Sequence, residues 1–263
     1  MDFWIIILVA LLCSAVGFFM YIYFFSVGYG LAIAGIGVTF LIGFNGRLQL
    51  PEIIICCLFV IYGLRLGLYL LIRDSKNKAY RKLTTPERER GHRLKIGYKL
   101  LIWVSCALLY YLETCPVYFR LNNGAPVDAM LWVGIVIMVI GMILEIIADI
   151  QKNSAKKKHP GRFVDAGLYR LVRCPNYLGE VLIWLGVLLS GITALEGAGQ
   201  VIAAVLGFAL IVYVMLSGAR RLELRQDKNY GNDPEYQKYV KSVPILFPFI
   251  PLYSVKKYKI FSA

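Results

Sequence analysis

The chain has 263 residues, of which 59% are hydrophobic and 17% charged, and it carries a formal net charge of +13. Its mean hydropathy of +0.64 excludes an ordinary soluble domain and indicates an integral membrane protein. Six cysteines without a C-x-x-C pair and only two histidines predict neither a disulfide framework nor a metal centre. Basic loops on one side of a membrane explain the positive charge, so we expect no nucleic-acid partner.

Long apolar segments follow one another along the chain and predict an all-α, polytopic bundle of about seven transmembrane helices. The first lacks a basic start and a cleavage site, so we interpret it as a retained helix and not a signal peptide. Glycines dot the second, which favours close helix packing over a phosphate loop. The segments are 3–25, 27–44, 53–72, 100–118, 129–148, 175–191 and 200–216.

The third segment carries a polar stripe. Tyr62, Arg65, Tyr69 and Arg73 share one face, because the helix turns about 100° per residue. Tyr69 as an interfacial aromatic and Arg73 reaching the headgroups would be ordinary. Arg65 lies deeper and needs an anionic partner, either a side chain or a ligand phosphate or carboxylate, and we favour a functional role for it. Tyr62 fits a functional and a structural role equally well.

A polar, basic loop at 73–99 follows the third segment. Further along the chain, the segment 129–148 closes with Glu145 and Asp149, four residues apart. Acids at a helix C-terminus oppose the helix dipole and require a compensating cation. Lys152 and the run 156–158 supply one, which would be a structural role. A bound cofactor's hydroxyl or amide would use the same carboxylates, and both interpretations stay open.

Residues 161–185 form the stretch around which the chemistry is organised. Pro175 suits the first turn of a helix, and Asn176 and Glu180 then point from one face. A carboxylate this close to a bilayer marks a functional site. After the last apolar segment comes a tail that opens at Arg220 and runs to PILFPFIPLY, which we expect to lie at the membrane interface.

The basic residues are distributed unevenly. The stretches 73–99, 149–175 and 218–263 hold 10, 7 and 9 of the 29 Lys and Arg residues. The positive-inside rule then places the N-terminus outside and the C-terminus in the cytosol. The corresponding membrane would be a bacterial inner membrane or, in a eukaryote, the endoplasmic reticulum.

Three motifs in order, YGLRLGLYLLIR, GRFVDAGLYRLVRCPNYLGEVLIW and LELRQDKNYGNDPEYQKYVKSVPILFP, resemble the membrane family of steroid 5α-reductases and sterol reductases. The resemblance covers about residues 55–250. It divides the chain into a poorly matched two-helix region, 1–52, and a reductase-like membrane domain, 53–263. It implies NADPH bound in a helical bundle open to the cytosol and hydride transfer to a carbon–carbon double bond of a lipophilic substrate.

The resemblance also implies residue roles. Tyr62 would hydrogen-bond the substrate carbonyl as a catalytic residue, with Glu180 as its partner or the proton source. Asn176 would hold the nicotinamide amide, and Arg162 and Arg173 would contact phosphates. The predicted cofactor-binding residues are Arg65, Tyr69, Arg73, Asp149, Lys152, Arg162, Arg173, Asn176, Tyr177, Arg221, Arg225 and Tyr230.

Two departures from the family pattern leave alternatives. The steroid enzymes pair the substrate tyrosine with a glutamate near the start of the second span, where this chain has Ser26 and Gly28. Cys174 stands where bacterial members have histidine. One alternative is an S-adenosylmethionine-dependent methyltransferase of the isoprenylcysteine or phospholipid type, which is similar around Cys174 and in the tail. The other is a lipid-binding relative that has lost the reaction.

Overall fold

The computed structural model describes every residue except 77–80, 82–83 and 262–263. The chain divides into two compact units. The first comprises Met1–Ile135 and Val187–Gly207, and the second comprises Val136–Gly186 and Phe208–Ala263. Three helices therefore have one end in each unit.

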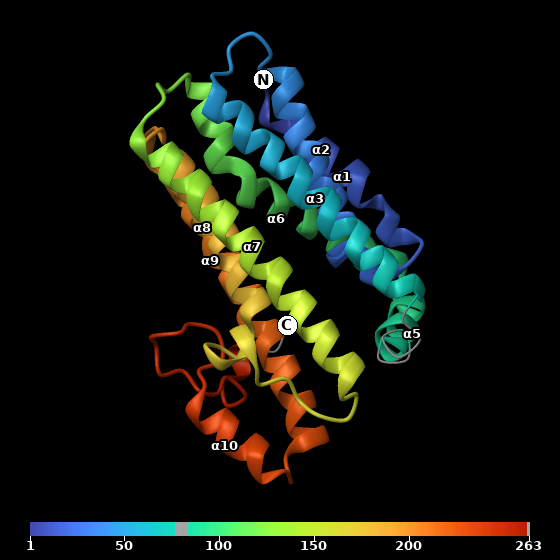
Figure 1. Ribbon diagram of the computed structural model, residues 1–263. Helices are drawn as coiled ribbons and strands as arrows, with labels where there is room; N and C mark the ends of the chain where they lie inside the picture. Colours follow the sequence, from blue (N-terminus) through green and yellow to red (C-terminus); the bar gives the residue numbers. More distant parts are fainter. Residues whose placement is uncertain (77–80, 82–83, 262–263) are drawn as a thin grey trace. The chain divides into compact units, whose positions relative to one another are not determined.

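All regular structure in the described residues is helical (Figure 1). By length and composition, α3, α6, α7, α8 and α9 are able to cross a membrane, whereas α1 and α2 are apolar but shorter. The predicted polytopic membrane bundle is confirmed. The helices are α1 (Phe3–Ser14), α2 (Val27–Gly43), α3 (Leu50–Lys76), α5 (Thr85–Arg93), α6 (Ile96–Asn123), α7 (Ala129–Lys158), α8 (Pro175–Ile192), α9 (Gly197–Tyr230) and α10 (Pro234–Ser242).

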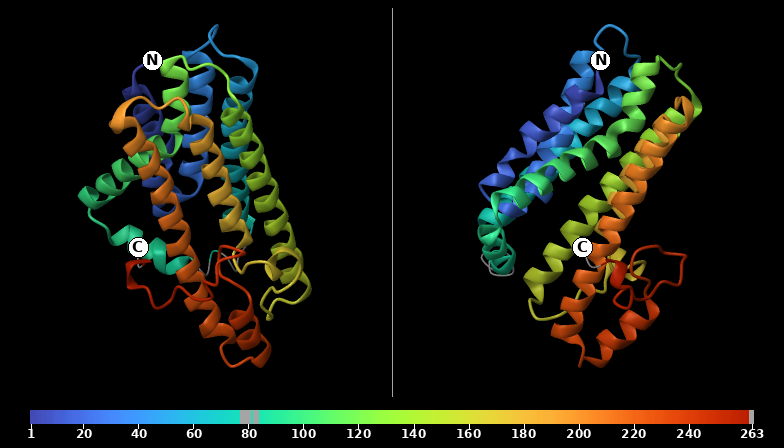
Figure 2. Two further views of the ribbon diagram at one scale, coloured as in Figure 1. Left: turned by 90° about the vertical axis from the view of Figure 1, so that its left-hand side faces the viewer. Right: turned by 180° about the vertical axis from the view of Figure 1, so that it is seen from behind.

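Helices α2 and α3 run side by side in the first unit (Figures 1 and 2). A Cβ added at Gly30 would lie 2.5 Å from the carbonyl oxygen of Gly63, and a Cβ at Gly63 would collide with the carbonyl oxygen of Gly30. Only glycine at both positions allows this approach. The predicted role of the second segment's glycines in close packing is confirmed.

Helix α3 has one buried face and one outward face. Phe59, Tyr62 and Leu66 are buried within the unit, whereas Leu64 and Leu68 are 52% and 59% exposed. Because α3 is long and apolar enough to span a membrane, its outward leucines fit a lipid-facing surface. The polar stripe thus starts on the packed side of the helix.

The first apolar segment, 3–25, was predicted to be one helix, but it is not. Helix α1 ends at Ser14, and two 3₁₀ helices follow, η1 (Ala15–Phe18) and η2 (Tyr21–Phe25). The Ser14 hydroxyl donates to the Ala10 carbonyl at 2.6 Å, and a side chain at Gly17 would collide with the ring of Phe24. The chain turns at Phe19 and Met20, between η1 and η2, and Phe24 of η2 packs against Gly17.

Three further helices differ from prediction. Helix α6 has 28 residues with Pro116 inside it, where a short segment 100–118 was expected. Helix α5 forms within the predicted loop 73–99, and α9 continues through Tyr230, so the expected start of the tail at Arg220 is helical. α6 and α9 continue past their apolar segments through polar and charged residues. A helix, once formed, adds one backbone hydrogen bond per residue, and this does not depend on whether the residue is apolar.

Helix α7 also continues past its predicted end at residue 148. It runs to Lys158 and has Lys156, Lys157 and Lys158 in its last turn. Glu145 and Asp149 therefore lie inside the helix, and the expectation that they oppose its dipole at the C-terminus is wrong. The three lysines carry the favourable charge for that end.

In the second unit, α7 and α8 touch through glycine and the C-terminal tail folds onto α8 and α9. A Cβ at Gly141 would lie 2.7 Å from the carbonyl oxygen of Gly179. Tail residues Ile245, Leu246 and Val255 are buried in a core with Cys174, Val181 and Ala219. Phe249, in a turn of the tail, is 96% exposed. The tail's position at a membrane interface stays a prediction.

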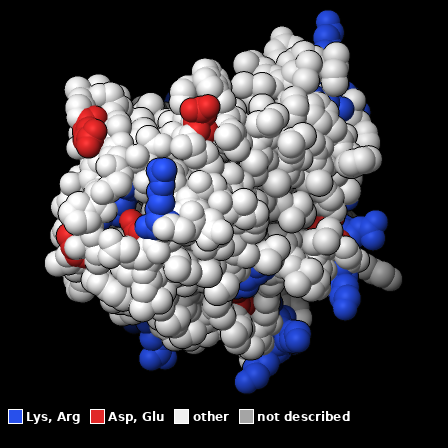
Figure 3. Space-filling view, turned by 90° about the horizontal axis from the view of Figure 1, so that it is seen from above, with Lys and Arg blue, Asp and Glu red and all other residues white. Residues whose placement is uncertain are grey.

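Few charged groups lie on the face seen from above Figure 1. Figure 3 shows that most side chains there are uncharged, with scattered Lys and Arg in blue and Asp and Glu in red. The α2–α3 loop at the top of Figure 1 contributes one basic residue, Arg47. The orientation of the termini across the membrane stays a prediction.

Candidate functional site

Three tyrosines from three helices meet in the first unit, and we call them the tyrosine cluster: Tyr29 of α2, Tyr62 of α3 and Tyr110 of α6. Tyr62 is fully buried, and its hydroxyl donates to the Tyr29 hydroxyl at 3.3 Å. The rings of Tyr29 and Tyr110 lie 5.1 Å apart, centroid to centroid. Tyr110 donates to the carbonyl oxygen of Phe24 at 2.5 Å. A set of phenol donors is therefore assembled inside an apolar helix bundle.

The rest of the polar stripe carries positive charge. The Arg65 guanidinium carbon lies 5.9 Å from the centre of the Tyr62 ring, and that of Arg73 lies 5.5 Å from the Tyr69 ring. Cation–π contacts at these distances are favourable. Arg65, Tyr69 and Arg73 are each partly exposed. The stripe pairs a buried phenol with a cation one turn away.

Asp74, which follows Arg73 at the end of the polar stripe, contacts two residues from other segments, and sequence reasoning did not find this cluster. Its carboxylate accepts from the Tyr23 hydroxyl at 2.9 Å and forms an ion pair with Arg88 of α5. Burial, followed by the hydrogen bond to Asp74, raises the pKa of Tyr23. The contacts hold η2 and α5 against the end of α3. No periodicity signals this cluster, because the three residues come from separate segments.

Asn176 and Glu180 occupy the first two turns of α8 in the second unit, as expected. Asn176 is partly exposed, whereas Glu180 is 6% exposed and accepts a hydrogen bond of 3.1 Å from the Trp184 indole nitrogen. Asp149 and Lys152 lie partly exposed on α7. Trp184 was missed by sequence reasoning, although its i, i+4 spacing from Glu180 signals the contact.

Arg173, predicted to contact a phosphate, is buried at the start of this region. Its guanidinium forms a 2.9 Å ion pair with Glu223 of α9 and donates to the Tyr253 carbonyl at 2.5 Å. Glu223 also accepts from the backbone amides of Val255 and Lys256. We call these five residues the arginine cluster. It fastens the tail to α9 and to the entrance of α8.

The arginine cluster keeps spare donors. Among the described residues, no acceptor bonds the buried Nε or Nη1 atoms of Arg173. Buried guanidinium donors without acceptors are costly, and a phosphate is the ligand that Arg binds best. The residues present therefore fit a dinucleotide phosphate, although Arg173 also has a structural task.

The cysteine beside Arg173 is not a nucleophile. Burial raises the pKa of the Cys174 thiol to about 12, despite the lowering effect of nearby Arg173 and Lys152. The thiolate is the reactive form, so this thiol is inert near neutral pH. Burial likewise raises the pKa of Tyr236 and of Tyr239.

Arg162 lies on an open cavity of about 390 Å³ between the end of α7 and the loop that follows it. Lys158 and His159 line the same cavity. Arg162 is already paired with Asp165 at 2.9 Å and with Glu235 at 2.5 Å. Hydrogen bonds to Glu235 and then to Asp165 raise the pKa of Arg162. The cavity can receive a phosphate or an adenine edge, but part of its positive charge is neutralised.

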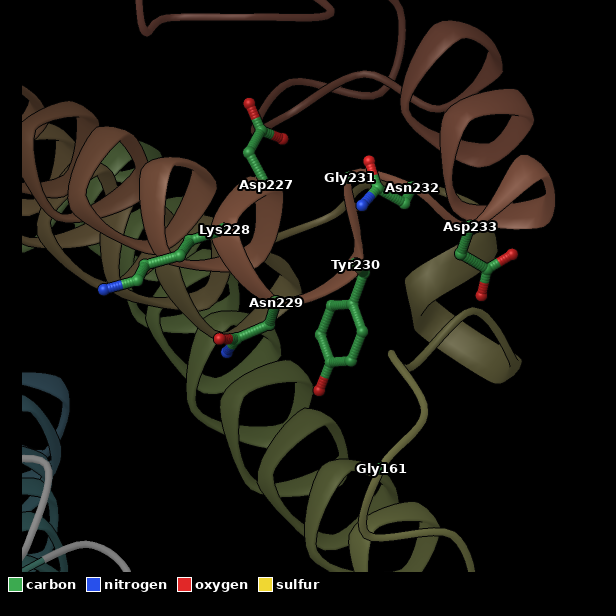
Figure 4. A pocket seen from close by; sticks show the side chains of 8 residues that line it. All are labelled: Gly161, Asp227, Lys228, Asn229, Tyr230, Gly231, Asn232 and Asp233. Carbon is green, nitrogen blue, oxygen red and sulfur yellow. The ribbon is translucent and has the colours of Figure 1, made fainter.

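Tyr230 lies at a second open cavity, of about 340 Å³, at the turn from α9 to α10 (Figure 4). Its hydroxyl accepts from Lys156 at 2.8 Å. The carboxylates in the cavity are engaged: Asp227 binds Tyr236 and Lys256, and Asp233 caps α10. Beside these engaged carboxylates the cavity is lined by the Tyr230 ring, by Asn229 and Asn232, and by the cation of Lys228.

The other predicted cofactor residues lie on two helices of the second unit. Arg221 and Arg225 are exposed one turn apart on α9. Tyr177 of α8 packs against Gly218, where an added Cβ would lie 3.2 Å from its ring. The predicted residues thus form two sets: positions 62–73 belong to the first unit and positions 149–230 to the second.

A family model described as "Protein of unknown function (DUF1295)" matches residues 24–243. The chain belongs to this family. It is a steroid 5-alpha-reductase-like family, so the resemblance predicted from the three motifs is confirmed. The match begins ahead of α2 and ends just past α10, and both sets of predicted site residues fall within it.

Curated relatives carry names of related activities. The chain is 30% identical over 156 residues to a very-long-chain enoyl-CoA reductase of Dictyostelium discoideum, covering 56% of this chain and 44% of that protein. It is 39% identical over 56 residues to the steroid 5-alpha-reductase DET2 of Arabidopsis thaliana, covering 20% of this chain and 21% of that protein. It is 28% identical over 143 residues to the human 3-oxo-5-alpha-steroid 4-dehydrogenase 1, covering 52% of this chain and 49% of that protein. The aligned region spans less than half of each relative, and no solved structure matches the chain.

Proposed function

We propose that this protein is an NADPH-dependent membrane reductase that saturates a carbon–carbon double bond conjugated to a carbonyl group in a lipophilic substrate. The observation that carries the proposal is the buried Tyr62 hydroxyl in a spanning helix, hydrogen-bonded to a second phenol and adjacent to Arg65. The names of the relatives support it, because two are named as reductases and the third as a 4-dehydrogenase of a 3-oxo steroid.

The chemistry needs a donor at the carbonyl oxygen. When hydride adds to the β-carbon, the double-bond electrons move toward the carbonyl and negative charge develops on its oxygen. Tyr62 donates a hydrogen bond to that oxygen, and Arg65 stabilises the charge from one turn away. Preorganised donors in a dry site are often the largest contribution to catalysis. A proton added to the α-carbon completes the reduction, and we assign Glu180 as its source.

The second unit supplies the residues for the cofactor. Bound NADPH supplies the hydride. Asn176, partly exposed in the first turn of α8, has an amide suited to a nicotinamide carboxamide. The spare donors of Arg173 and the exposed Arg221 and Arg225 suit phosphates. Asp149, Lys152, Tyr177, Arg162 and Tyr230 complete the proposed binding set.

Ligand protection tests the cofactor. A ligand present at 100 times its dissociation constant raises the free energy of unfolding by about 2.7 kcal/mol. We expect NADPH, and not S-adenosylmethionine, to raise the melting temperature of the protein purified in detergent. Protection by S-adenosylmethionine alone would establish the methyltransferase alternative.

Substitutions then test the binding residues. Asn176→Ala and Arg221→Ala should each weaken NADPH binding about tenfold or more in a titration, while Asn45→Ala, on the exposed α2–α3 loop, should not. Arg173→Ala is a poor test, because it also breaks a buried ion pair. Unchanged affinity in both test variants would refute the assignment of the second unit to the cofactor.

A further inference from the structure

The last described residues of the tail run back along α9. The backbone amide of Lys256 donates to Glu223 at 3.1 Å, and the Lys256 carbonyl oxygen accepts from the Nε atom of Arg220 at 3.3 Å. Farther along the tail, the carbonyl oxygen of Ile260 accepts from the Tyr213 hydroxyl at 2.9 Å. As the tail advances, its partners on α9 therefore step back from residue 223 to 220 and then to 213.

These contacts carry the tail past the charged boundary of α9. From Gly197 to Ala219 this spanning helix has no charged residue, and Arg220 is the first charge. The uncharged part is about 34 Å long, enough for the hydrocarbon core of a bilayer. Tyr213 lies about 10 Å before Arg220 along the helix axis. The Ile260 carbonyl, bonded to Tyr213, therefore lies on the hydrocarbon side of Arg220.

We call residues 256–261 the chain-end segment, and it presents apolar side chains outward. Ile260 is 72% exposed and Tyr258 is 51% exposed. Phe261 instead packs on α9, with its ring centre 5.9 Å from that of Tyr213. One aromatic ring thus fastens the segment to the helix, while the other apolar side chains face away from the protein at the level where α9 passes from apolar to charged residues.

The chain-end segment is also basic. Two acids of α9 contact the tail here: Glu223 is paired with Arg173, and Asp227 is paired with Lys256 at 2.7 Å. The carboxylate of Asp227 cannot compensate three ammonium groups, so the segment stays positively charged. Amphipathic side chains beside lysines suit the boundary between acyl chains and headgroups, and anionic headgroups complement the charge. The segment contains no acid, and its exposed lysines are Lys256, Lys257 and Lys259.

We propose that the chain-end segment is a binding site for an anionic phospholipid. Tyr258 and Ile260 enter the edge of the hydrocarbon layer, and Lys257 and Lys259 bind the phosphate of the headgroup. Because Lys256 belongs to the arginine cluster, the bound lipid also holds the tail on α9. The proposal is independent of the proposed function, since none of the residues of the segment is assigned to substrate or cofactor.

Lipid binding with a matched control tests the role of the charge. Native mass spectrometry of the full chain in detergent compares dioleoyl phosphatidylglycerol with dioleoyl phosphatidylcholine, which differ only in the headgroup. The wild type should bind the anionic lipid about tenfold more tightly. Lys257→Gln combined with Lys259→Gln should lose about five- to tenfold in that affinity. The control, Lys238→Gln with Lys241→Gln, removes the same charge from exposed positions of α10 and should change it less than about twofold.

Photo-crosslinking tests the depth of the segment. The photoreactive amino acid p-benzoylphenylalanine replaces Ile260 or, as a control, the exposed Lys241 of α10, and each variant is placed in nanodiscs that contain phosphatidylglycerol. Irradiation should attach lipid at position 260 and not at position 241.

Four results would each overturn the proposal: no preference of the wild type for the anionic lipid, equal losses in the two double variants, displacement of the lipid by an equal concentration of glycerol 3-phosphate, or no lipid adduct at position 260.

Discussion

The tyrosine cluster of the first unit and the arginine cluster of the second are both buried and polar, but they are built differently. In the tyrosine cluster, neutral hydroxyls meet at 3.3 Å and a cation lies beside a ring. In the arginine cluster, a guanidinium and a carboxylate, 2% and 3% exposed, are joined at 2.9 Å, and the same carboxylate accepts two backbone amides.

The difference shows which cluster holds the fold and which one is available for chemistry. Removing one partner from a buried, multiply bonded ion pair leaves an uncompensated charge. The phenols of the tyrosine cluster are neutral, so removing one hydroxyl leaves no uncompensated ion behind. We therefore expect substitutions in the arginine cluster to act on stability and those in the tyrosine cluster to act on catalysis.

The largest expected effect is on stability. Glu223→Ala should lower the free energy of unfolding by about 3–5 kcal/mol, because Arg173 is left buried without its counter-ion and the tail loses its anchor. Glu235→Ala breaks the exposed pair with Arg162 and should cost about 0–1 kcal/mol. Denaturant or thermal unfolding in detergent measures both. Equal effects would show that the buried ion pair of the arginine cluster stabilises the fold no more than an exposed pair does.

A catalytic effect should come next. Tyr62→Phe should lower kcat by about 10²–10³, the usual effect of removing one oxyanion donor, without weakening NADPH binding. Steady-state kinetics and a cofactor titration measure the two quantities. A parallel loss of melting temperature and kcat would instead make Tyr62 a packing residue.

Helix contact beneath the tyrosine cluster should also be sensitive. Gly30→Ala places a methyl group against the backbone of Gly63 and should cost about 1–3 kcal/mol. Gly97→Ala, on α6, meets nothing within 4 Å and should stabilise the helix by up to about 1 kcal/mol. If unfolding experiments show a loss of stability for Gly30→Ala and a gain for Gly97→Ala, the close glycine contact between α2 and α3 next to the tyrosine cluster is confirmed. A stable Gly30→Ala variant would contradict it.

The smallest effect concerns pH in the α6–α7 loop of the first unit. Although desolvation opposes it, hydrogen bonds from Thr193 and Arg120 lower the pKa of Asp128 from 3.8 to about 2. A depressed pKa in the folded state means that the stabilisation is present above about pH 4 and is lost as the pH falls toward 2. The difference in melting temperature between wild type and Asp128→Asn should be constant from pH 8 to about 4 and shrink below that. A difference that is the same at pH 3 and pH 7 would exclude this linkage.

The sequence alone determined the class of the protein and several of its contacts. Runs of apolar residues predicted the membrane helices, and Pro175 marked the start of α8. The spacing of Asn176 and Glu180 placed them on one face, and the glycines of α2 predicted close packing. These features depend on local periodicity, which is written into consecutive residues.

Only the tertiary structure decided which distant residues meet. No local pattern links Tyr29 to Tyr62, or Arg173 to Glu223 and Tyr253, because those pairs come from elements 33 to 80 residues apart. It also showed that α7 continues past Asp149 and that 15–25 turns back, since packing and side-chain hydrogen bonds, not hydropathy, end or extend a helix. The candidate roles of Tyr62 and Arg173 depend on these long-range contacts.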